Sequence, residues 1–122
     1  MNLEGALPAI SLVSQTGLIT AFSNDVNPEY IFAQQAYAYC LPGDILWGLS
    51  TSGNSKNVVH ALKVAKARGA VTLGMTGAGG GAMLSFCDIV IRVPETETFK
   101  VQELHLPVYH LLCAAVETEM FD

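Results

Sequence analysis

The chain has 122 residues, of which 51% are hydrophobic and 14% charged, and its formal net charge is −5. This length suits one core, so we predict a single domain over residues 1–122, and the composition leaves little room for disorder. The acidic balance disfavours nucleic acid as a partner, because nucleic-acid binding normally uses a basic face. No stretch reaches the ~20 apolar residues that a membrane span requires, so we expect no membrane partner either.

The cysteines favour a reducing compartment. Cys40, Cys87 and Cys113 are odd in number, follow no metal-binding spacing and have apolar neighbours, which is typical of reduced core residues. The first residues lack the basic segment and long apolar run of a signal peptide. We therefore expect a soluble, cytoplasmic protein.

The first half of the chain alternates predicted strand and helix. A β-prone run covers Ala9–Ser14, and Pro28 begins a helix that extends through Cys40 with apolar residues at helical spacing. Turn residues follow at 41–44, and Ile45–Leu49 is a continuous apolar strand.

The second half repeats this alternation. A helix over Lys56–Arg68 ends at a glycine, a second buried strand covers Ala70–Met75, and a short helix is expected around Met83. Ile89–Val93 forms the last strand, and a final helix runs over Thr98–Phe121. Strands separated by helices pair in parallel, so we predict an α/β fold, a three-layer sandwich with a parallel, Rossmann-like sheet of about four strands.

A serine-rich loop joins the strand at Ile45–Leu49 to the helix that follows it. Hydroxyls at Ser50, Thr51, Ser52 and Ser55 lie where a helix start presents free backbone N–H groups and the positive end of its dipole. The alternative is a polar turn whose serines only cap the helix. Four hydroxyls in six residues favour a phosphate site at the carboxyl end of the strand, where ligands bind in such sheets.

The glycine run Gly77–Gly81 is weaker evidence for a ligand site. It lacks the lysine of a Walker motif and the spacing of a dinucleotide fingerprint, so we interpret it as a mobile connector rather than a nucleotide loop.

The last helix carries the side chains that could do chemistry. With about 100° per residue, Gln102 and His110 lie ~80° apart and can converge on one site, whereas His105 is turned ~140° from His110. From the residues alone, His110 is better interpreted as a buried histidine bonded to a carbonyl. Much of this helix is apolar around its circumference, which predicts packing against a second subunit.

Two stretches carry a family resemblance. The signature of SIS (sugar isomerase) domains resembles "LSTSGNSKNVVHALKVAKARG", and the end of the phosphoheptose isomerase subgroup resembles "IRVPETETFKVQELHLPVYH". The similarity runs from about Ala9 to the C-terminus. Family members carry, before this point, a helical arm and a strand ending in a Gly-Asn-Gly-Gly-Ser-type loop, so the resemblance implies an N-terminally truncated SIS domain.

The resemblance implies an aldose–ketose isomerase that interconverts sedoheptulose 7-phosphate and D-glycero-D-manno-heptose 7-phosphate. It implies that Gln102 and His110 are zinc ligands, that Gln102 also lies at the substrate, and that His110 is an acid or base. It assigns Asn24 and Asp25 to the sugar hydroxyls, although a plain turn before a helix uses the same residues. It also implies a homotetramer with active sites at subunit contacts.

The chain has no counterpart for the first His ligand and the catalytic Glu of the family. Two ligands hold zinc poorly, so we expect weak or absent zinc and low turnover in this chain. The alternative is a non-catalytic SIS protein that binds sugar phosphates or a replication initiator; such proteins tend to lack a His at the position of His110.

Overall fold

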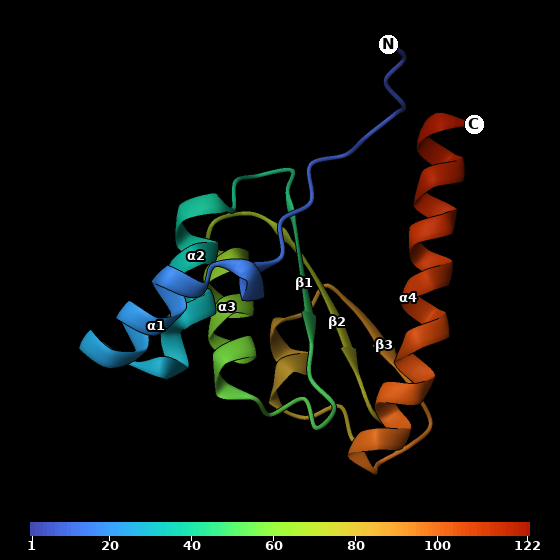
Figure 1. Cartoon of the computed structure of the whole chain (residues 1–122). Coiled ribbons are helices and arrows are strands. Elements are labelled where there is room, and N and C mark those ends of the chain that lie inside the picture. Colours follow the sequence, from blue (N-terminus) through green and yellow to red (C-terminus); the bar gives the residue numbers. More distant parts are fainter.

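The computed structural model describes all 122 residues and contains one three-stranded parallel sheet. Its strands are adjacent in chain order: β1 (Ile45–Leu49), β2 (Val71–Thr76) and β3 (Ile89–Arg92). The helix α3 (Lys56–Ala67) connects β1 to β2 (Figure 1). Because the strands are parallel, the loops that follow β1 and β2 leave from the same edge of the sheet.

The helices lie on both sides of this sheet. Helices α1 (Thr16–Asp25), α2 (Ile31–Tyr39) and α3 are on one side, and α4 (Thr98–Phe121) is on the other (Figure 1). This confirms the predicted α/β sandwich. Three short 3₁₀ helices link the larger elements: η1 (Leu12–Ser14), η2 (Pro28–Tyr30) and η3 (Ala82–Phe86). None of the helices combines the length and the apolar character needed to cross a bilayer.

The core lies between the sheet, α2 and α3. Leu62 of α3 and Met83 of η3 are fully buried in one cluster, and small alanines of α2 and α3 form a second. Gly48 of β1 lets α3 come close, because a Cβ there would lie 2.9 Å from a methyl group of Val58. The side of the sheet that faces α3 is therefore well packed.

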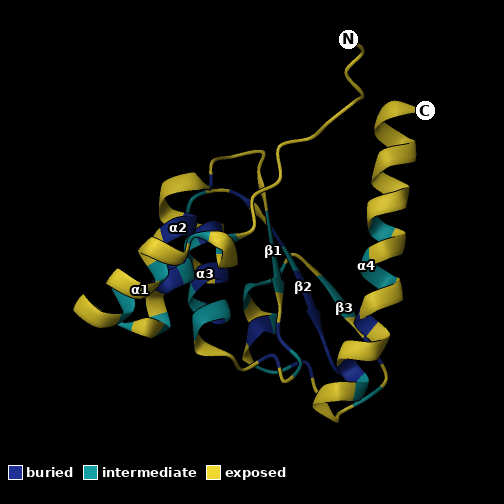
Figure 2. Cartoon of the chain, viewed as in Figure 1, coloured by how far each residue is buried: buried dark blue, intermediate teal, exposed yellow.

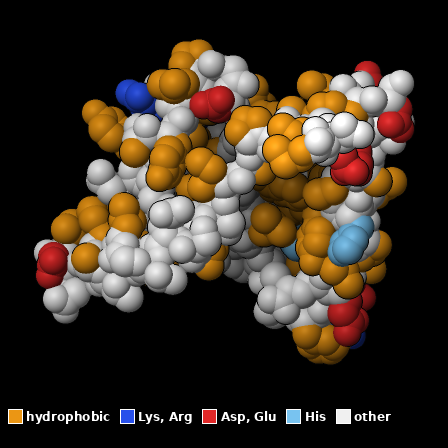
Figure 3. Space-filling model, turned by 45° about the horizontal axis from the view of Figure 1, so that its top comes forward, with side chains coloured by type: hydrophobic (Ala, Val, Ile, Leu, Met, Phe, Trp, Pro, Cys, Tyr) orange, Lys and Arg blue, Asp and Glu red, His pale blue; other side chains and the backbone are white.

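The opposite face of the sheet is apolar but largely open. Ile45 and Ile89 on this face are 67% and 55% exposed. The long helix α4 lies beside it, yet Val101 and His105 are its only buried residues (Figure 2). Figure 3 shows hydrophobic side chains gathered along α4 and around a hollow beside it. This face has more apolar surface than α4 covers.

The strand predicted over Ala9–Ser14 is wrong, and the sheet has three strands rather than about four. The Ser14 hydroxyl and backbone N–H both donate to the Ser11 carbonyl, at 2.7 and 3.2 Å, which closes a 3₁₀ turn. The Leu12 carbonyl accepts from the Gln35 side chain of α2 at 3.0 Å. These bonds give the Ser11 and Leu12 carbonyls partners outside a sheet, and no neighbouring strand pairs with the segment.

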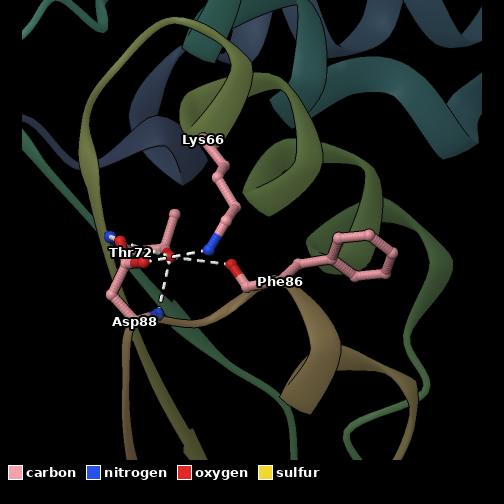
Figure 4. Close-up of polar contacts among 4 residues, drawn as sticks. All are labelled: Lys66, Thr72, Phe86 and Asp88. Carbon is pink, nitrogen blue, oxygen red and sulfur yellow. Dashed lines mark hydrogen bonds and ion pairs between the residues drawn. The ribbon is translucent and has the colours of Figure 1, made fainter.

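A polar network closes the amino-terminal edge of the sheet (Figure 4). Asp88 accepts from the Thr72 backbone N–H and from the Lys66 ammonium, both at 2.9 Å. The Thr72 hydroxyl donates to the Phe86 carbonyl at 2.7 Å and accepts from the Asp88 N–H at 2.9 Å. These donors, the Thr72 N–H first, hold the pKa of Asp88 below its ordinary value. The network joins α3, β2 and the start of β3 at the edge away from the serine loop.

Candidate functional site

The serine loop, residues 50–55, turns β1 into α3 at the carboxyl edge of the sheet. Ser50 is buried and organises it: its hydroxyl oxygen accepts from the backbone N–H groups of Gly53 and Ser55, at 3.1 and 3.4 Å, and lies 2.9 Å from the Ser55 hydroxyl. The Ser52 hydroxyl accepts from the Asn54 N–H at 3.1 Å. The residues grouped by the sequence prediction are thus together, with Ser50 shaping the loop and the others nearer the solvent.

Four backbone N–H groups of this region have no partner within the chain. They belong to Thr51 and Ser52 in the loop and to Lys56 and Asn57 in the first turn of α3. The first N–H groups of a helix point along its axis, and the helix dipole adds positive potential there. The arrangement can therefore bind an anion the size of a phosphate.

The loop after β2 holds the serine loop in place. Gly53 has φ +70°, and a Cβ on it would collide with the Gly80 carbonyl oxygen. Asn54 accepts from the Ala82 N–H at 2.8 Å, and the Gly53 carbonyl accepts from the Met83 N–H at 2.9 Å. These bonds brace the end of the glycine run, interpreted from the sequence as a mobile connector, against the serine loop.

The first turn of α4 reaches the same edge. A Cβ on Gly77 would lie 2.9 Å from the Thr51 carbonyl oxygen and 3.0 Å from a methyl group of Val101, so the serine loop, the end of β2 and α4 meet at this glycine. Gln102 follows Val101, and both Gln102 and His110 have exposed side chains. His110 is therefore not the buried histidine that the residues alone allowed.

His105, which the sequence analysis left without a role, is the buried histidine of α4. It is 4% exposed, and its Nε2 lies 3.1 Å from the Thr76 carbonyl oxygen. Helical spacing predicted that His105 faces away from His110. Its partner could not be predicted, because Thr76 is 29 residues away in the sequence.

Asn24 and Asp25 lie at the end of α1 and are exposed. The Asn24 side-chain amide donates to the Asp25 carboxylate at 2.9 Å. No hydrogen bond joins either side chain to the serine loop or to α4. The structure thus groups these two with each other and leaves both available to a ligand.

A hollow of about 270 Å³ lies beside the serine loop. Glu29, which the sequence analysis missed, lies 3.1 Å from the Lys56 ammonium and 4.0 Å from His60 Nε2. Lys56, the cation at the start of α3, is therefore already paired with a carboxylate. The hollow is lined by Glu29, Asn54, Lys56, Val59, His60, Lys63 and Ala82.

Two of the three cysteines, Cys40 and Cys87, are poor nucleophiles. Burial, and then the neighbouring Asp44, raises the pKa of the Cys40 thiol; burial and Asp88 do the same for Cys87. Cys113 is exposed on α4, in contrast to the core position predicted for it. Neither Cys40 nor Cys87 is thus favoured as a thiolate nucleophile.

The residues present do not complete a zinc site. No three His, Cys, Asp or Glu side chains lie close enough together to hold a metal ion. Gln102 and His110, the two ligands that the family resemblance implies, are one fewer than the three protein ligands that catalytic zinc usually takes.

Comparison with known proteins gives a consistent result. The model of the SIS domain family matches residues 10–115. Phosphoheptose isomerase of Rhodospirillum rubrum is 48% identical over 111 residues, which are 91% of this chain and 59% of the relative, and that of Synechocystis sp. is 47% identical over 95% of this chain and 60% of the relative.

Solved structures agree in fold. Phosphoheptose isomerase of Francisella tularensis superimposes with a TM-score of 0.87 and 34% identity over 91% of this chain and 60% of that one. The enzyme of Neisseria gonorrhoeae superimposes with a TM-score of 0.85 and 34% identity over 88% of this chain and 61% of that one. This chain spans about three fifths of the length of these relatives. The chain belongs to the SIS domain family, and the relatives it resembles are phosphoheptose isomerases.

Proposed function

We propose that this chain is the sugar-phosphate-binding and proton-transferring part of a phosphoheptose isomerase. The reaction is the interconversion of sedoheptulose 7-phosphate and D-glycero-D-manno-heptose 7-phosphate. One observation carries the proposal: a loop with clustered hydroxyls and four unpartnered N–H groups lies beside the start of α4. That loop provides the anion site that a phosphorylated sugar needs.

The chain's own residues take separate roles in this proposal. The phosphate binds to the free N–H groups of Thr51 and Ser52 and to the hydroxyls of Thr51, Ser52 and Ser55, while Ser50 keeps the loop in shape. His110 moves a proton between adjacent carbons through an enediol, since an imidazole can act as both general base and general acid. Gln102 contacts the sugar from the same helix.

Asn24 and Asp25 are assigned to the sugar hydroxyls. Their amide and carboxylate groups are exposed at the end of α1 and already lie in hydrogen-bonding range of each other. A pair of this kind can donate to one hydroxyl and accept from its neighbour.

A matched set of variants tests the proposal. Ser52→Ala combined with Ser55→Ala is expected to weaken binding of the heptose phosphate about tenfold or more by calorimetry, because hydrogen bonds to a charged group are lost. His110→Ala is expected to leave that affinity within about threefold and to lower turnover about 10²-fold or more. Unchanged affinity in the double variant would refute the phosphate site.

A second candidate function is sugar-phosphate binding without turnover. The observation in its favour is the missing third metal ligand, together with the exposed position of His110. The same assays separate the two functions. Tight binding of the heptose phosphate with no turnover in the presence of zinc, even when the chain is extended to the length of its relatives, would favour the binding protein.

We further propose that the protein works as a homo-oligomer, a dimer or tetramer, in the cytoplasm. The support for the oligomer is the apolar surface of α4 and of the sheet face beside it, which the chain leaves exposed. The support for the compartment is a set of three unpaired cysteines in an enzyme of sugar phosphates.

A further inference from the structure

We propose that His105 is a positioning residue that fixes the rotation of α4 about its own axis, and so the direction of Gln102 and His110. The inference rests on the proposed function of those two side chains. Helix α4 has 24 residues, but only Val101 and His105 are buried. A single apolar contact allows a helix to roll, whereas a directional hydrogen bond one turn further on does not.

The hydrogen bond has a defined donor. The Thr76 carbonyl oxygen already accepts from the Val93 N–H at 3.0 Å, and His105 Nε2 lies 3.1 Å from the same oxygen. A carbonyl oxygen has two lone pairs and can only accept. His105 therefore donates through a protonated Nε2, and in the neutral ring Nδ1 carries no proton.

Helical geometry turns this bond into a constraint on the site. Viewed along the axis of α4, Gln102 is rotated by about 60° from His105 and His110 by about 140°, both in the same direction. A roll of 20° would move side-chain atoms by about 2 Å, because they lie about 5–6 Å from the helix axis. A misplacement of about 1 Å can already cost 10²-fold in rate, so a free roll would impair catalysis.

The partner of His105 also holds the phosphate loop. Thr76 is fully buried, its hydroxyl lies 3.4 Å from the Thr51 carbonyl oxygen, and the next N–H, of Gly77, donates to that oxygen at 3.1 Å. The end of β2 thus ties to the serine loop on one side and to α4 on the other. Neither Thr51 contact involves His105, so the phosphate loop keeps its shape without the histidine.

Two substitutions at His105 and one control form the test. His105→Gln retains an N–H donor of similar reach, and His105→Met retains volume without a donor. Glu103→Gln changes an exposed residue of the same helix. We expect the Met variant to lower kcat tenfold or more with KM changed less than threefold, the Gln variant to recover most of kcat, and the control to match the unmodified chain.

Two further measurements do not depend on turnover. In nitrogen-15 spectra of the unmodified chain, neutral His105 is expected as the Nε2–H tautomer. Residual dipolar couplings of α4 amides relative to the sheet should be unchanged in His105→Gln and altered in His105→Met, while inorganic phosphate binds both variants within twofold. The Nδ1–H tautomer, or wild-type couplings in the Met variant, would overturn the inference. If the unmodified chain, extended to the length of its relatives, shows no turnover, the proposed function fails, while the tautomer and the couplings still decide the role of His105.

Discussion

The missing Cβ of Gly53 decides how closely the serine loop and the glycine run Gly77–Gly81 can approach each other. Gly53 combines a φ of +70° with a position against the Gly80 carbonyl, so Gly53→Ala is expected to strain the backbone and push the loops apart. We expect a loss of more than about 1 kcal/mol in the free energy of unfolding, and at least tenfold weaker phosphate binding by calorimetry.

Gly79 provides the matched control for this substitution. A Cβ there meets no atom within 4 Å, and its φ is not positive. Gly79→Ala should leave both the unfolding free energy and the phosphate affinity near their original values. Equal losses in the two variants would mean that the glycine run acts through flexibility rather than through close packing.

At the scale of elements, periodicity and turn residues predicted most of the secondary structure. The strand at Ile45–Leu49 and the helix at Thr98–Phe121 are confirmed at both ends. The predicted strand at Ala9–Ser14 is wrong because serine-to-backbone bonds replace sheet pairing, and a six-residue pattern cannot show whether a partner strand exists.

For the candidate site, too, some features could be predicted from the sequence and others could not. The grouping of Ser50, Thr51, Ser52 and Ser55 was predictable, because four hydroxyls within six residues cannot lie far apart. The inward position of Ser50 and the pairing of Lys56 with Glu29 were not, because both depend on contacts made by the folded chain. Contacts between distant segments carry no local sequence signal.

The network at the amino edge of the sheet predicts sensitivity to acid. The pKa of Asp88 is lower in the folded state than its ordinary value of 3.8, so the carboxylate stabilises the fold above that value. This contribution is lost as the pH falls through the folded pKa, below about pH 4. Asp88→Asn should therefore lower the free energy of unfolding at pH 7, and the difference from the unmodified chain should shrink below pH 3.

Urea unfolding at pH 7 and at pH 2.5 checks this expectation. Glu119→Gln is the control, because Glu119 is exposed on α4 and makes no ion pair. A difference for Asp88→Asn that is equally large at both pH values would contradict the assigned role of the carboxylate.

The whole molecule exposes more surface than a compact monomer. Its accessible area is 7830 Å², whereas a monomer of 13.0 kDa is expected to expose about 6,300 Å². Large apolar residues account for part of the excess, and they gather on α4 and the open sheet face (Figure 3). The difference of about 1,500 Å² per chain exceeds the ~800 Å² that each partner buries in a stable interface of standard size.

We therefore expect light scattering at micromolar concentration to give a mass of two or four times 13.0 kDa. Leu111 on α4 is 70% exposed, and Leu111→Glu should shift the mass toward the monomer, because a charge cannot be buried in an apolar interface without a partner. Val26→Glu is the control, since Val26 is 65% exposed at the end of α1, on the other side of the sheet (Figure 1). It should leave the mass unchanged. A monomeric mass for the unmodified chain would show that the apolar surface of α4 does not serve self-association.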